Sequence, residues 1–140
     1  MPNNDHTSSR YANQRPCADI GVYEFDFYAI QRGRRHAVLV EARGVPEGML
    51  YRFVIPRRYL TPCPSDGYIL AKVSESVTLP IEEISGLRLK MMGYESREAF
   101  VESLRVDRCM DDVSLKTRVT IVQLKDAEHR GLKGRFSLFF

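Results

Sequence analysis

The segment that most constrains the fold is His36 to Ala42 (HAVLVEA), which is apolar at almost every position. A strand with one face in water alternates apolar and polar residues, whereas a strand buried on both faces is apolar throughout. We therefore expect this segment to be a strand covered on both sides, or a strand in the wall of a barrel. A chain of 140 residues with 44% hydrophobic residues can bury such a strand within one domain.

Turn-forming residues divide the rest of the chain into short segments. Gly44 to Gly48 predicts a turn, and Pro56 ends a second strand because proline cannot donate to a sheet. The other expected elements are strands at Ile20–Tyr23, Met49–Ile55, Tyr68–Val73 and Lys116–Lys125, and helical segments at Ile81–Met91 and Ser96–Leu104. This order predicts an α+β fold, a small and partly closed β-barrel with flanking helices.

Residues 24 to 32 fit two structures. The letters YEFDF from Tyr23 alternate aromatic and acidic residues, which favours an arm of a β-hairpin. Phe27 and Ile30 are three residues apart, and Gly33 follows as a helix C-cap would, which favours a helix. The periodicity leaves both open.

The ends of the chain differ in composition. Residues 1 to 18 are polar and predict a flexible N-terminal arm, so that residues 19 to 140 form the single domain. No apolar run approaches the roughly 18 residues of a membrane span, and the N-terminus lacks the apolar stretch of a signal peptide. We therefore expect a cytoplasmic protein that does not bind membranes.

The metal-ligating residue types are scattered. Cys17, Cys63 and Cys109 are far apart in the sequence, and the three histidines are no closer to one another. Zinc sites and disulfide frameworks use paired, closely spaced ligands. We expect reduced thiols, no metal and no cofactor.

The positive charge is unevenly distributed. The net charge is only +3, but one segment is rich in arginine and contains no lysine, with Arg32, Arg34, Arg35, Arg43, Arg52, Arg57 and Arg58. Arginine is favoured where phosphate or carboxylate groups are held by two hydrogen bonds at once. The segment therefore predicts either a phosphate-binding cleft or a solvated barrel face.

Three stretches of this sequence resemble the ASCH family, a branch of the PUA-like β-barrels, over roughly residues 20 to 125. Ile30 to Arg35, leading into the strand at His36, looks like the short helix, glycine and basic signature of the family. Val45 to Leu50 matches its glycine turn, and Met92 to Phe100 (MGYESREAF) is close to its G-aromatic-x-S-x-E-x-F helix start. The resemblance implies a helix at residues 25 to 32 and an association with RNA or nucleotide-derived ligands.

One bacterial branch of that family hydrolyses N4-acetylcytidine with a lysine, a threonine and a glutamate. The matching positions here are Arg35, Val38 and Gly93, with Met92 beside the last. Valine has no hydroxyl, glycine supplies no base, and a guanidinium does not deprotonate a nucleophile. Glu95, two residues away, is a weak substitute. We therefore expect no amidohydrolase activity, name no catalytic residue, and expect binding rather than catalysis.

The expected function is binding of RNA or a nucleotide in a basic cleft. An aromatic ring beside arginines can stack a splayed base while the cations hold its phosphate, although barrel tyrosines also pack in cores. The candidate ligand-binding residues are Arg34, Arg35, His36, Arg52, Arg57, Arg58 and Tyr94.

Two other functions remain open. The barrel could be the scaffold of a protein-interaction or inhibitory protein whose tail, Phe136 to Phe140, extends a partner's sheet, unless that tail closes the domain's own barrel. An RNA-cleaving or nucleoside-hydrolysing enzyme could use His36 beside the arginines for proton transfer. His36 could equally be an ordinary first residue of a strand.

Overall fold

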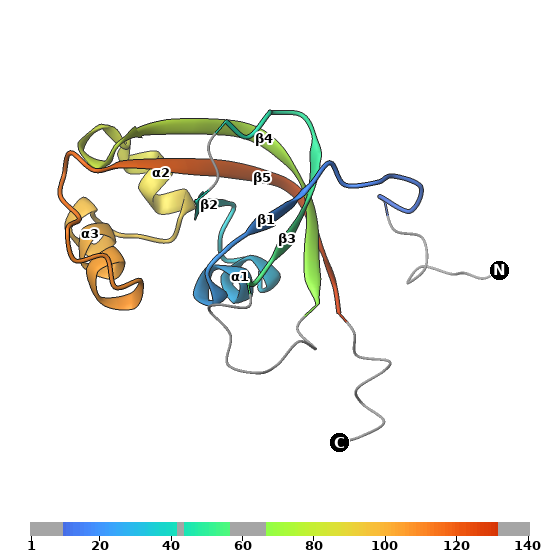
Figure 1. The fold of residues 1–140 in the computed structure, drawn as a ribbon, viewed down its shortest axis with the longest axis horizontal. Coiled ribbons are helices and arrows are strands. Elements are labelled where there is room, and N and C mark those ends of the chain that lie inside the picture. Colours follow the sequence, from blue (N-terminus) through green and yellow to red (C-terminus); the bar gives the residue numbers. More distant parts are fainter. Residues whose placement is uncertain (1–9, 42–43, 57–66, 132–140) are drawn as a thin grey trace, which may run out of the picture.

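A mixed five-stranded sheet organises the computed structural model, which describes residues 10–41, 44–56 and 67–131 (Figure 1). The elements along the chain are β1 (Asp19–Gly21), α1 (Glu24–Gln31), β2 (Ala37–Val40), β3 (Leu50–Val54), β4 (Tyr68–Pro80), a 3₁₀ turn (Ile81–Glu83), α2 (Gly86–Met91), α3 (Arg97–Asp107) and β5 (Arg118–Arg130).

The strand order in the sheet is β1-β3-β4-β5-β2. The pair of β1 and β3 is parallel, and the other three pairs are antiparallel. Within the described ranges β1 and β2 are the two edge strands, so the sheet curls without closing. The expected α+β class and the partly closed barrel with flanking helices are confirmed.

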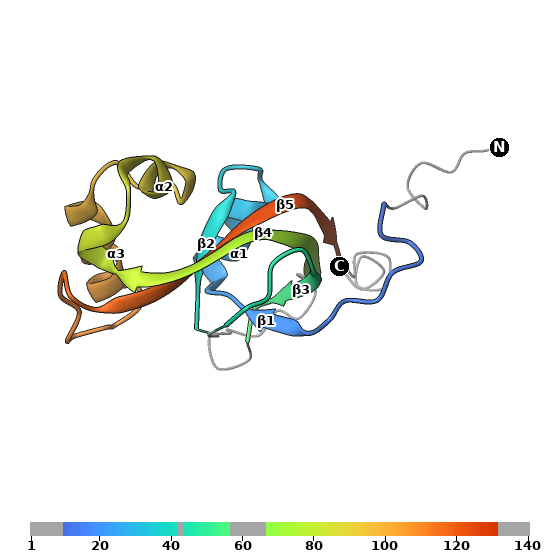
Figure 2. The same cartoon turned by 90° about the horizontal axis from the view of Figure 1, so that it is seen from above.

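The two longest strands, β4 and β5, pair with each other along most of their length. The first part of β4 pairs with β3, and the strand then continues beside β5 toward α2 and α3 (Figures 1 and 2). Register shifts between Leu70 and Lys72 and between Val73 and Glu75 interrupt the ladder, and such irregularities bend a strand.

The sequence prediction ended β4 at Val73, which is too early. The strand runs to Pro80, because its second half pairs with β5 in a register that includes Leu79 opposite Val119. Ser74 and Glu75 are polar and exposed, so they interrupt the hydrophobic pattern from which the end of the strand is predicted. β5 was likewise expected at residues 116 to 125 and extends to Arg130.

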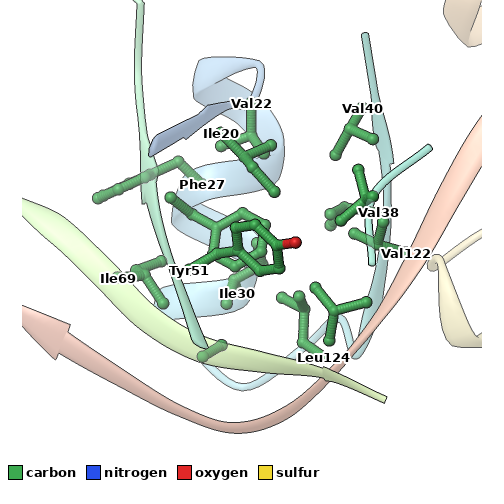
Figure 3. Packing of buried hydrophobic residues seen from close by; sticks show 14 residues of the cluster. Ile20, Val22, Phe27, Ile30, Val38, Val40, Tyr51, Ile69, Val122 and Leu124 are labelled. Atoms are coloured by element: carbon green, nitrogen blue, oxygen red, sulfur yellow. The ribbon is translucent and has the colours of Figure 1, made fainter. Parts of the chain in front are cut away.

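The sheet has a separate hydrophobic cluster on each side of β2. Val38 and Val40 pack with α1, β1 and β3 in the first cluster, which Figure 3 shows. Ala37 and Leu39 pack with α2 and α3 in the second. All four residues of β2 are therefore buried, and the expectation of a strand covered on both faces is confirmed.

Residues 24 to 31 form a helix rather than a hairpin arm. Phe27 and Ile30 face the first cluster, and tertiary packing thereby decides what the periodicity left open. Gly33, at φ +72°, donates its N–H to the Ile30 carbonyl and ends the helix in a conformation that favours glycine. α3 begins at its expected N-cap, where Ser96 Oγ accepts from the Ala99 N–H at 3.0 Å.

Residues 10 to 18 are mostly exposed but are attached to the sheet at Tyr11 and Cys17. Tyr11 is buried, and its hydroxyl donates to the Asp126 carbonyl at 2.8 Å. The Cys17 N–H donates to the Leu50 carbonyl at 2.7 Å. From Arg10 onward the chain is therefore not the free arm that its polar composition suggested. The tail at residues 136 to 140 lies outside the described residues.

Because β2, β4 and β5 contribute to both clusters, we expect them to unfold together. Phe53→Ala in the first cluster and Leu104→Ala in the second should each lower the free energy of unfolding by about 2–5 kcal/mol, since both side chains are fully buried. Urea unfolding followed by circular dichroism should show one transition in each variant. Two separated transitions in either variant would contradict a shared cooperative unit.

Candidate functional site

The site is built around one buried carboxylate, that of Asp26 on α1. Its residue is 1% exposed, and two guanidinium groups reach it from different parts of the chain. Arg35, from the loop between α1 and β2, donates through Nη1 to Asp26 Oδ1. Arg108, the residue that ends α3, donates through Nη2 to Asp26 Oδ2. We call these three residues the ion cluster.

Both arginines of the ion cluster also lie on aromatic rings. The guanidinium carbon of Arg35 is 4.9 Å from the ring centre of Tyr94 and 5.7 Å from that of Phe25. That of Arg108 is 4.3 Å from the ring centre of Tyr23. Cation–π contacts of this kind strengthen when water is excluded, so the rings and cations hold one another in place.

Burial and charge act in opposite directions on Asp26. Burial, the larger influence, raises the pKa of its carboxyl, and the guanidinium groups of Arg108 and Arg35 act to lower it. The side chain of Arg108 is only 4% exposed, and its Nη1 has no hydrogen-bond partner among the residues that the structure describes. Two guanidinium groups facing one carboxylate leave a net positive charge at the ion cluster.

A cavity of about 550 Å³ is lined in part by Arg108, and we call it the aromatic hollow. Its lining residues are Tyr23, Glu24, Phe25, Tyr28, Tyr94, Ser103, Asp107, Arg108 and Cys109. Polar groups form a chain along its wall: the Tyr94 hydroxyl is 3.1 Å from Ser103 Oγ, which donates to Asp107 Oδ2 at 3.1 Å. Four aromatic side chains and a short polar chain thus face one space.

A second cavity of about 430 Å³ adjoins the first, and we call it the arginine hollow. It is lined by Phe25, Tyr28, Ala29, Arg32, Arg34, Arg35 and Gly93. Phe25 and Tyr28 line both hollows, and Phe25 is 67% exposed, which is unusual for so large an apolar side chain.

Gly93 allows Arg35 to lie where it does. Its φ is +91°, and a Cβ at this position would come within 2.8 Å of Arg35 Nε. Both the backbone conformation and the close approach therefore favour glycine.

The candidate residues from the sequence fall in several places. Arg34 and Arg35 line the arginine hollow, and Tyr94 lines the aromatic hollow beneath Arg35. His36 lines neither and is exposed, with its backbone N–H donating to the Met91 carbonyl. Arg52 also lines neither.

Arg52 has its own partners on the strand pair of β1 and β3. It donates to both carboxylate oxygens of Asp19, at 2.7 and 2.8 Å, and stacks on Tyr68. Arg57 and Arg58 lie outside the described residues.

The sequence pattern did not indicate most of the residues that line the two hollows. Phe25, Tyr28, Ala29 and Arg32 are spaced at i, i+3, i+4 and i+7, so a firm assignment of residues 24 to 31 as a helix would have placed them on one face. For Arg108 no local signal exists, because it lies 82 residues from Asp26 in sequence.

The described part of the chain contains neither a candidate metal site nor a candidate membrane-spanning helix. Residues 10–41, 44–56 and 67–131 contain no group of three histidine, cysteine, aspartate or glutamate residues placed to hold a metal ion. Among the same residues, no helix has both the length and the apolar character to cross a membrane.

We expect Asp26→Asn to lower the free energy of unfolding by about 3–5 kcal/mol, because it leaves two buried guanidinium groups without a counter-charge. The matched control is Asp19→Asn, which breaks the exposed pair with Arg52 and should cost about 0–1 kcal/mol. Urea denaturation measures both. Equal effects of the two substitutions would show that the ion cluster is not a structural centre.

Comparison with sequence models of known families finds no match, and comparison with curated proteins finds none either. Among solved structures the chain is similar to one described as the crystal structure of ASCH from Zymomonas mobilis. The sequence identity is 16% and the TM-score 0.49, and the superposition covers 81% of this chain and 68% of that one. A likeness at this level carries no information about ligand or activity.

Proposed function

We propose that this domain binds a nucleotide unit, either free or within single-stranded RNA, across the aromatic and arginine hollows. The observation that carries this is the shared wall: Phe25 and Tyr28 join an aromatic space to one lined by three arginines. A nucleotide has the same two parts. Its flat base stacks on aromatic rings, and its phosphate binds guanidinium groups.

In this proposal the phosphate binds Arg32 and Arg34. Arg35 already faces the buried Asp26 carboxylate. Arg32 and Arg34 are exposed, and neither has an acidic partner among the residues that the structure describes. Their guanidinium groups are therefore available to an anion from solution, and arginine binds phosphate through two parallel hydrogen bonds.

The shape of the site favours an unpaired base. Cavities of about 550 and 430 Å³ fall in the range of small-molecule sites, which is roughly 300–1,000 Å³. The base of a duplex is enclosed by its neighbours, whereas a base in a single strand can be splayed out and stacked on a side chain. Phe25 offers such a surface because the residue is largely exposed.

The described residues do not favour the two alternative functions expected from the sequence, RNA cleavage with His36 and binding of a protein partner through the tail. His36 lines neither hollow, so its location does not favour RNA cleavage. The tail that could bind a protein partner lies outside the described residues. We retain a cytoplasmic location as part of the proposal, because the two cysteines of the described ranges, Cys17 and Cys109, are free thiols and such thiols suit a reducing compartment.

Phe25→Ala should weaken binding of a short single-stranded RNA by roughly 5- to 150-fold, since loss of one stacking ring costs about 1–3 kcal/mol. The exposure of Phe25 means that the fold should survive, and thermal unfolding checks this. Fluorescence anisotropy with a labelled trinucleotide measures the affinity, and competition by a nucleoside monophosphate shows whether the free nucleotide suffices. Unchanged affinity in the variant would remove the aromatic hollow from the site.

Arg34→Ala should weaken binding and reduce the salt dependence of the affinity. One lost phosphate contact lowers the slope of log K against log salt by about 0.7 for a single strand. Arg52→Ala is the control, because Arg52 pairs with Asp19 away from both hollows. Equal losses in the two variants would mean that RNA follows the general surface charge instead of the arginine hollow.

A further inference from the structure

The two hollows differ in their charged side chains, and this asymmetry restricts the ligand. Arg32 and Arg34 stand at the arginine hollow, whereas Glu24 and Asp107 place carboxylates on the aromatic hollow. A carboxylate at neutral pH only accepts hydrogen bonds. The part of the ligand that enters the aromatic hollow must therefore present hydrogen-bond donors.

Asp107 is held ready to accept them. Ser103 Oγ donates to Asp107 Oδ2 at 3.1 Å, and the Tyr94 hydroxyl lies 3.1 Å behind Ser103 Oγ. Because the Ser103 hydroxyl donates its hydrogen to Asp107, it must accept in the bond with Tyr94, and the Tyr94 hydroxyl is the donor there. Asp107 has no basic partner within the described ranges, and its Oδ1 accepts from none of their donors.

Arg108 lines the same hollow, but its guanidinium group is not open to a ligand. Its side chain is only 4% exposed, its Nη2 donates to Asp26, and its Nη1 is buried and has no partner among the residues that the structure describes. Arg108 therefore holds Asp26, and the carboxylate of Asp107 is the group that can accept hydrogen bonds from a ligand.

We infer that the base read in the aromatic hollow is guanine, an inference that rests on the proposed nucleotide-binding function. Guanine alone among the four RNA bases offers two parallel donors, N1–H and the 2-amino group, to one carboxylate, here that of Asp107. Adenine and cytosine bring one amino group, and uracil brings a single N–H flanked by two carbonyl oxygens, which a carboxylate repels.

The test compares the affinities of five nucleoside monophosphates for the full-length protein by isothermal titration calorimetry: those of guanosine, inosine, adenosine, cytidine and uridine. A bidentate contact discriminates by roughly 5- to 150-fold, so the guanosine nucleotide should bind at least about five-fold more tightly than the others. Inosine lacks the 2-amino group and should lose most of this advantage. Equal affinities for all five overturn the guanine inference and leave nucleotide binding intact.

Binding of none of the five, nor of a short RNA containing all four bases, would instead overturn the proposed function. Asp107→Asn identifies the residue that reads the base: it should bring the guanosine nucleotide down to the affinity of the adenosine nucleotide, without changing the latter more than about two-fold. Asp112→Asn is the matched control, an exposed aspartate that lines neither hollow, and should keep the preference. A guanine preference that survives Asp107→Asn overturns the assignment of Asp107.

Discussion

The buried carboxylate of Asp26 determines the geometry of everything around it. It stands on α1 and is held by one arginine nine residues later and another 82 residues later. A buried ion pair is no more stabilising than well-packed apolar side chains would be, so its main consequence here is position. Because the same guanidinium groups lie on Tyr23, Phe25 and Tyr94, the carboxylate also orients the rings of the aromatic hollow.

This arrangement joins the two halves of the molecule. α1 belongs to the first hydrophobic cluster and α3 to the second, and the long strands β4 and β5 contribute residues to both. The bond between Asp26 on α1 and Arg108 at the end of α3 also links the two clusters, through their helices. The aromatic hollow lies at this junction, where side chains from two separately packed clusters meet and leave space between them. Junctions between packed units are common places for ligand sites.

The net charge of +3 does not show how the charged side chains are distributed within the site. Glu24 and Asp107 line the aromatic hollow, whereas Arg32 and Arg34 line the arginine hollow, and the proposed ligand with donors at one end and negative charge at the other rests on this difference. The bond of Arg35 to Asp26 sharpens this contrast, because Arg32 and Arg34 are the arginines of this hollow without an acidic partner among the residues that the structure describes. Local pairing, more than composition, therefore decides what each arginine can do.

The sequence by itself determined the local elements: the doubly buried strand β2, the turn before β3, the N-cap of α3 and the α+β class follow from hydrophobic pattern and turn chemistry within short windows. It also singled out Arg34, Arg35 and Tyr94, which line the hollows, together with Arg52 and His36, which do not. Only the tertiary structure decided that residues 24 to 31 are a helix, that β4 continues past its polar stretch, and that Arg108 meets Asp26. The physical reason is that these outcomes depend on contacts between residues far apart in the chain, whereas a periodicity reports only on neighbours.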